Sequence, residues 1–105
     1  MSFGKLILEA RVRKEYSLTK CASLILKEDG VPISIQYLTD IENDRRNPSR
    51  DHLLRQLSRV LDIPLVALYF HAGRLLPQTI KKVTEDQITD AYRAFYEKLG
   101  QKITF

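Results

Sequence analysis

One stretch of sequence, ISIQYLTDIENDRRNPS at residues 33–49, decides how this chain folds. Ser34 is a residue type that caps helix N-termini, and Leu38 and Ile41 follow at the spacing of one helix face. Asn43 tolerates the left-handed backbone conformation that often ends a helix. The stretch therefore predicts a short helix of about two to three turns, followed by a basic loop.

The outward face of this predicted helix mixes amide, hydroxyl, carboxylate and apolar groups, whereas a purely solvated face is usually rich in Lys and Glu. Such groups read base edges and thymine methyls in the major groove of DNA. Gln36 offers a donor and an acceptor suited to adenine, Asp40 an acceptor suited to cytosine, and Ile35 and Tyr37 apolar contact with thymine. The expected base-reading residues are Ile35, Gln36, Tyr37, Thr39 and Asp40.

Basic residues follow the predicted reading helix immediately, and they suit phosphate oxygens. A second anion site is expected where another helix starts at Ser17, because N-terminal amides and the helix dipole favour an anion there. The residues predicted to bind DNA phosphates are Ser17, Thr19, Lys20, Ser34, Asn43, Arg45, Arg46 and Arg50.

The same stretch resembles the second helix and exit loop of the Cro/repressor-like (Xre-type) helix-turn-helix family. The family's pattern is matched here by Leu38, Ile41, Glu42, Arg45, Arg46, Asn47, Pro48 and Ser49. The similarity extends over about residues 3–76, and it implies a five-helix DNA-binding domain in which Arg11 is structural and Ala22 lies where two helices cross. Leu18 departs from the pattern, since many members have a Gln there that contacts the DNA backbone.

The larger departure is residues 26–32, which make the connection about six residues longer than the family's tight turn. Gly30 and Pro32 exclude a continuous helix through it. One interpretation is a longer second helix followed by a surface loop, because loops lengthen at little cost in free energy. The other is a site for a partner or for subunit contact. Phosphates would repel Glu28 and Asp29, so we expect the loop to point away from DNA.

Caps and apolar periodicity predict the other helices in the same way. Ser49 is expected to cap the fourth helix, and residues 78–83 are expected to form one helical turn. The fold class is therefore all-α: a five-helix repressor-like DNA-binding domain at residues 1–76, with an extra C-terminal amphipathic helix within residues 77–105. The helices of the domain are expected over residues 3–14, 17–25, 34–43, 49–61 and 64–70.

The C-terminal helix starts with a capping box at Thr84 and Gln87, and Gly100 ends it. One face is apolar and aromatic, as is typical of interface cores. Such a face is expected either to pair with a second subunit or to pack back on its own domain. The residues predicted to hold a dimer together are Ile88, Tyr92, Phe95, Tyr96 and Leu99.

Composition limits the other possibilities. The 105 residues, 44% of them hydrophobic, are enough for one domain with its own core. No apolar run approaches the roughly 18 residues that span a bilayer, and no signal-peptide core is evident, so we expect a cytoplasmic protein that does not contact membranes. Cys21 has no second cysteine to pair with, and with His52 and His71 it gives no zinc spacing. No metal and no cofactor are expected.

These features predict a sequence-specific DNA-binding transcriptional regulator that acts as a homodimer on an inverted-repeat operator in double-stranded DNA. The net charge of +4 is a mild indication of an anionic partner. One alternative is the antitoxin of a toxin-antitoxin pair, with the C-terminal segment holding the toxin. Another is a protein-interaction module that keeps the fold without binding DNA, which Leu18, Asp40 and Asp44 favour. Catalysis is not expected, because the sequence has no Ser/His/Asp order and no Gly-rich phosphate loop.

Overall fold

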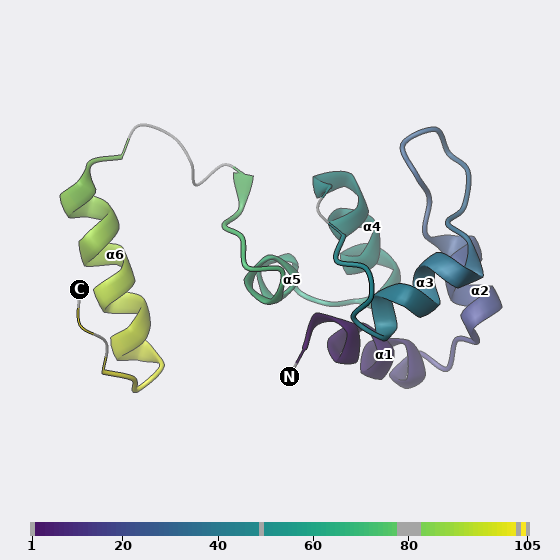
Figure 1. Ribbon diagram of the computed structural model, residues 1–105, viewed down its shortest axis with the longest axis horizontal. Helices are drawn as coiled ribbons and strands as arrows, with labels where there is room; N and C mark the ends of the chain where they lie inside the picture. The colour runs from purple at the N-terminus through teal and green to yellow at the C-terminus, as the bar shows by residue number, and fades with distance from the viewer. Residues whose placement is uncertain (1, 49, 78–82, 103, 105) are drawn as a thin grey trace.

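The computed structural model describes residues 2–48, 50–77, 83–102 and 104, and this part of the chain is all-α (Figure 1). Its β structure is limited, within those residues, to one isolated antiparallel bridge between Leu26 and Pro32. The helices are α1 (Phe3–Arg13), α2 (Leu18–Leu24), α3 (Ile35–Glu42), α4 (Asp51–Leu61), α5 (Leu65–His71) and α6 (Glu85–Lys98). The predicted order and type of the helices are confirmed.

The first five helices share one hydrophobic core. Each contributes the apolar stripe that its sequence predicts, and Leu38, Ile41, Leu54 and Leu57 are fully buried at its centre. Cys21 is also fully buried, and burial raises the pKa of its thiol to about 11. These surroundings are those of a small core side chain and not of a reactive thiol.

The first helix holds α3 at two points. Near the start of α1, the Gly4 N–H donates to Asp44 Oδ1 at 2.8 Å, and a Cβ added at Gly4 would lie 2.5 Å from the Ile41 carbonyl oxygen. Near its end, Arg11 donates through Nε and Nη2 to the two carboxylate oxygens of Glu42, at 2.6 and 3.1 Å. The predicted structural role of Arg11 is confirmed, whereas the close approach at Gly4 was not predicted.

The residues between α2 and α3 form a small hairpin, not a longer second helix, because α2 ends at Leu24. The Lys27 N–H donates to the Val31 carbonyl oxygen, and Gly30 turns the chain with a φ of 84°. Leu26 then fastens the hairpin to α4, donating through its N–H to the Gln56 side chain and accepting through its carbonyl oxygen from His52 Nε2. The predicted extension of the second helix is therefore wrong, whereas residues 27–31 are exposed, as expected for a surface loop.

Helix α4 begins at Asp51, with Arg50 at the N-cap position and no side-chain cap bond. Ser49, which was predicted to cap this helix, lies outside the described residues. The turn predicted over residues 78–83 also lies outside them, apart from Val83.

Helix α6 has the predicted capping box, in which the Thr84 hydroxyl accepts from the Gln87 N–H and the Gln87 side chain accepts from the Thr84 N–H. It lies at one end of the molecule, where its ribbon stands apart from that of α5 in Figure 1, and none of its residues is buried. Its contact with α5 includes the rings of Phe70 and Phe95, whose centroids lie 5.9 Å apart. No described helix combines the length and apolarity needed to cross a bilayer.

Candidate nucleic-acid interface

The candidate interface is the outward side of α3. Because Leu38 and Ile41 are fully buried, the residues a half-turn away from them face solvent. Gln36 and Asn43 are exposed there, and Thr39 and Asp40 are half-buried. Ile35 lies on one flank of this polar ridge with 46% of its surface exposed. Four of the five predicted base-reading residues, namely Ile35, Gln36, Thr39 and Asp40, therefore lie together on or beside one ridge.

Tyr37 is the exception among the predicted base-reading residues. It is half-buried, packs against the hydrophobic core and lies on the opposite flank of α3 from Ile35. The guanidinium carbon of Arg46 lies 5.8 Å from the centre of the Tyr37 ring, within the range of a cation–π contact. Tyr37 therefore packs against the core and contacts the basic loop through Arg46. This position does not favour the predicted contact of Tyr37 with a thymine methyl.

Asp40 links the ridge to the basic loop. Its Oδ1 accepts hydrogen bonds from Gln36 Nε2 at 2.9 Å and from Arg45 Nε at 3.1 Å. These bonds, that from Gln36 first, hold the pKa of the Asp40 carboxyl below its usual range. The side chain is therefore a carboxylate at neutral pH, and one of its oxygens already serves two donors.

Two further polar side chains on the ridge also bond locally. The Thr39 hydroxyl donates to the Ile35 carbonyl oxygen, and Asn43 Nδ2 donates to the Thr39 carbonyl oxygen, each at 2.9 Å. The Thr39 hydroxyl can then only accept from a base, because its single hydrogen is in use. Asn43 keeps a second amide hydrogen and an acceptor oxygen for a ligand.

The predicted phosphate-binding residues lie at exposed positions at the starts of α2, α3 and α4 and at the end of α3 with the loop that follows it. At the start of α2 the Ser17 hydroxyl accepts from the Lys20 N–H, and at the start of α3 the Ser34 hydroxyl accepts from the Tyr37 N–H. Both serines therefore act as helix caps, which leaves their hydroxyl hydrogens available as donors. The remaining members of the set are exposed: Thr19, Lys20, Arg45, Arg46 and Arg50.

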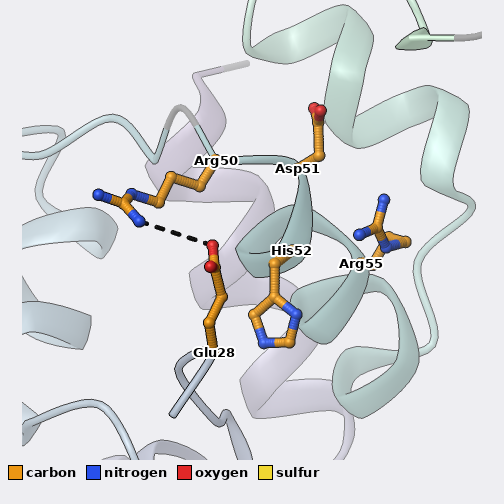
Figure 2. A pocket seen from close by; sticks show the side chains of 5 residues that line it. All are labelled: Glu28, Arg50, Asp51, His52 and Arg55. Atoms are coloured by element: carbon orange, nitrogen blue, oxygen red, sulfur yellow. Dashed lines mark ion pairs between the residues drawn. The ribbon is translucent and has the colours of Figure 1, made fainter.

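The inserted hairpin brings an acidic residue to this basic set. Glu28 lies 3.6 Å from Arg50 in an exposed ion pair, at the edge of an open depression that His52 and Arg55 also line (Figure 2). The expectation that this loop points away from DNA stays a prediction, although Glu28 lies beside Arg50, one of the predicted phosphate-binding residues. His52 is half-buried, and its Nε2 hydrogen-bonds to the Leu26 carbonyl oxygen of the hairpin.

A neighbouring carboxylate, that of Asp51 at the start of α4, is held by α5 and the residues that follow it. Asp51 Oδ1 accepts from the Tyr69 hydroxyl at 2.6 Å and from Arg74 Nη2 at 2.8 Å, and the Asp51 side chain points away from Glu28 in Figure 2. The hydrogen bond from Tyr69, more than that from Arg74, holds the pKa of Asp51 below its usual range. In the part of the chain that the structure describes, no group of three His, Cys, Asp or Glu side chains is arranged to hold a metal ion.

The apolar face of α6 is exposed along its length. The exposed apolar residues of α5 were not predicted from the sequence. The predicted dimerisation residues Ile88, Tyr92, Phe95 and Leu99 each expose 41–48% of their surface, and Tyr96 is half-buried. Two residues of α5 extend this surface, since Val66 exposes 59% and Phe70 exposes 56%. Their spacing of four residues was the available signal, although it was hidden within an almost continuous apolar run.

No family model matches this chain, and neither a curated protein nor a solved structure matches it significantly.

Proposed function

We propose that this chain is a sequence-specific DNA-binding regulator of the repressor-like helix-turn-helix class, which reads an inverted repeat as a homodimer. The observation that carries the proposal is the preformed polar ridge of α3. Gln36 is exposed on this ridge, and the half-buried Asp40 beside it joins it to Arg45 of the basic loop. Direct readout of bases in the major groove requires such groups on one side of a helix, and phosphate contacts from flanking residues set its register.

The features that favour a fold without DNA binding each have a structural explanation. Leu18 is partly buried against the core, so an apolar side chain there serves packing. Asp44 hydrogen-bonds to Ser2 and Gly4 at the start of α1, which holds the pKa of its carboxyl below the usual range. The negative charge of Asp40 is offset by two donors. These acidic and apolar residues therefore do not argue against contact with DNA.

The dimeric part of the proposal rests on α6. A helix of 14 residues with no buried side chain and a continuous apolar face lowers its free energy by covering that face. A second copy related by a two-fold axis would cover it, and reading of an inverted repeat requires a dimer that holds its two reading helices about one turn of DNA apart. The same face suits a toxin or another partner protein, which is the second candidate function.

Selection of bound sequences from a random pool of duplexes tests the proposal directly. An enriched inverted repeat is the expected result, and its affinity should fall with salt at a log–log slope of about −0.9 per phosphate contact. We extrapolate roughly four to eight contacts per dimer from that rule. No enriched sequence together with a slope near zero would exclude DNA binding.

A matched pair of variants tests the assignment of roles. Gln36→Ala should relax discrimination at one base pair, by about 1–3 kcal/mol for a bidentate contact, whereas Arg46→Ala should weaken binding to all sequences alike. If both variants lose affinity equally for specific and random duplexes, α3 is not the reading helix. Arg93→Ala on α6 is the control for the loss of an arginine that lies outside the proposed DNA-binding surface.

A further inference from the structure

We propose that Asp40 is a positioning residue, which orients Gln36 for base reading and couples it to the phosphate-binding Arg45, and that it does not itself read a base. This inference rests on the proposed function. It replaces the sequence-based expectation that Asp40 accepts a hydrogen bond from cytosine. It also assigns the Gln36–Asp40–Arg45 cluster one joint role, in place of three independent contacts.

The hydrogen-bonding capacity of the three side chains carries the argument. A carboxylate oxygen has two lone-pair sites, and both sites of Asp40 Oδ1 are taken by Gln36 Nε2 at 2.9 Å and Arg45 Nε at 3.1 Å. Readout of cytosine by this oxygen would require one of those bonds to break. The two bonds fix the orientation of the carboxylate, which favours a structural use. Its second oxygen, Oδ2, takes part in neither bond and could contact a base only in that fixed orientation.

The bond to Asp40 also decides what Gln36 offers to DNA. Nε2 spends one of its two hydrogens on Asp40, so the second hydrogen and Oε1 remain on the free edge of the amide. That pair of a donor and an acceptor is what bidentate recognition of adenine requires. Because the carboxylate cannot donate, it also opposes the flipped orientation of the amide. Asp40 thus prepares one arrangement of Gln36 before DNA arrives.

The same carboxylate restrains the first arginine of the basic loop. Arg45 is tied through Nε, which leaves its two terminal NH₂ groups for phosphate oxygens. Its side chain is 59% exposed, whereas that of Asp40 is 21% exposed, so the arginine lies further out toward a ligand than the carboxylate that holds it. A phosphate contact by Arg45 and a base contact by Gln36 then share one anchor.

The test uses the full chain and the duplex enriched from a random pool. Four variants are compared with the wild type: Gln36→Ala, Asp40→Ala, Asp40→Asn and the double variant Gln36→Ala with Asp40→Ala. Competition against every single-base change gives the preference at each position, and random-sequence duplex gives non-specific affinity. Circular dichroism checks that each variant keeps its helices, as expected for partly or fully exposed side chains.

The expected result has three parts. Gln36→Ala lowers the preference at one base pair by about 10- to 100-fold, and Asp40→Ala lowers it at the same base pair, with no further loss in the double variant. Asp40→Asn retains most of the preference, because its amide oxygen can accept from both donors. Affinity of Asp40→Ala for random duplex is unchanged or higher, since a negative charge near phosphates has been removed.

Direct reading by Asp40 predicts a different pattern and would overturn the inference. In that case Asp40→Ala would lower the preference at another base pair, and its effect would add to that of Gln36→Ala. Unchanged preference in Asp40→Ala would overturn the inference as well, while leaving the proposed function intact. A wild-type chain without any sequence preference would overturn both.

A second measurement does not depend on DNA. In the free protein, a carbon-detected NMR titration should give Asp40 a carboxyl pKa below its usual range, and Gln36→Ala should raise that pKa toward the usual value. Gln87→Ala on α6 is the control, and it should leave Asp40 unchanged. If Gln36→Ala also leaves the Asp40 pKa unchanged, the two side chains are not coupled and the inference fails.

Discussion

Arg11 of α1 and Glu42 of α3 form a two-pronged ion pair, with Nε to Oε2 at 2.6 Å and Nη2 to Oε1 at 3.1 Å. Both side chains are mostly buried, since 13% of Arg11 and 7% of Glu42 is exposed. Arg11 also donates through Nη1 to the Tyr16 carbonyl oxygen. The pair joins residues 31 positions apart and fixes the end of the proposed reading helix against the start of the chain.

Removal of Arg11 should therefore destabilise the fold. Arg11→Ala leaves Glu42 as a buried charge without its partner, and we expect a loss of about 3 kcal/mol in the free energy of unfolding, measured by urea denaturation. Arg13→Ala, at an exposed position of α1, should cost much less. A double variant, Arg11→Met with Glu42→Leu, should recover much of the lost stability. If the double variant instead loses as much stability as Arg11→Met and Glu42→Leu lose when their separate effects are added, the pairing is contradicted.

Gly4→Ala tests the close approach of α1 and α3. Alanine is favoured over glycine inside a helix by about 1 kcal/mol, so helix propensity alone predicts a gain in stability. The added methyl would lie 2.5 and 2.6 Å from the Ile41 and Glu42 carbonyl oxygens, so we expect a lower melting temperature instead. Thermal unfolding followed by circular dichroism measures the melting temperature. Lys5→Ala, at the exposed neighbouring position, is the control. A higher melting temperature would show that α1 can shift freely.

The contact between Tyr69 and Asp51 should make stability depend on acidic pH. Because the folded state holds the pKa of Asp51 below its usual range, the unfolded chain takes up a proton first as the pH falls. The stabilisation is therefore complete above the usual carboxyl pKa and is lost as the pH falls through the lowered value. Tyr69→Phe removes the largest cause of the shift, so wild type and variant should differ most at neutral pH and converge in acid.

Urea denaturation at a series of pH values between neutral and acidic measures this convergence. Tyr92→Phe on α6 is the matched control, because its ring lies on the exposed face of that helix. A difference between Tyr69→Phe and wild type that stays constant over the whole series would show that the hydroxyl acts through packing alone and not through Asp51.

The exposed face of α6 should hold the proposed dimer together. Truncation before Thr84 should leave a folded monomer, because the other helices share a core to which α6 contributes no buried residue. Tyr92→Glu and Phe95→Glu should act likewise by placing a charge in a desolvated contact. All three proteins should keep their helical circular dichroism, lose dimer mass in sedimentation, and lose operator affinity far more than half-site affinity.

Two further variants locate the edges of that interface. Phe70→Glu on α5 should also weaken the dimer, because its ring lies 5.9 Å from Phe95 and is 56% exposed. Ala94→Glu, on the opposite side of α6 from Tyr92, should leave the dimer intact. Unfolding of the truncated chain would assign α6 to the monomer core, and a dimeric truncated chain would place the interface elsewhere, with the inserted hairpin as the next candidate.

Local signals in the sequence were sufficient for the order of the helices and for the caps at the starts of several of them. Ser17, Ser34 and Thr84 each cap a helix as predicted, because a cap bond joins residues three positions apart and depends on nothing else. Apolar periodicity likewise predicted which side of α3 and α4 is buried. It also placed Gln36 and Asp40 on the outer side, one helical turn apart.

Relationships between distant residues were decided only by the tertiary structure. The Arg11–Glu42 pair, the backbone contact at Gly4 and the bonds between the hairpin and α4 join segments that are at least 26 positions apart. Their formation depends on how the helices cross, which hydrophobic burial drives without specifying polar partners. The sequence therefore determined the helices and the proposed reading surface, whereas packing decided which polar groups restrain that surface and which charges surround it.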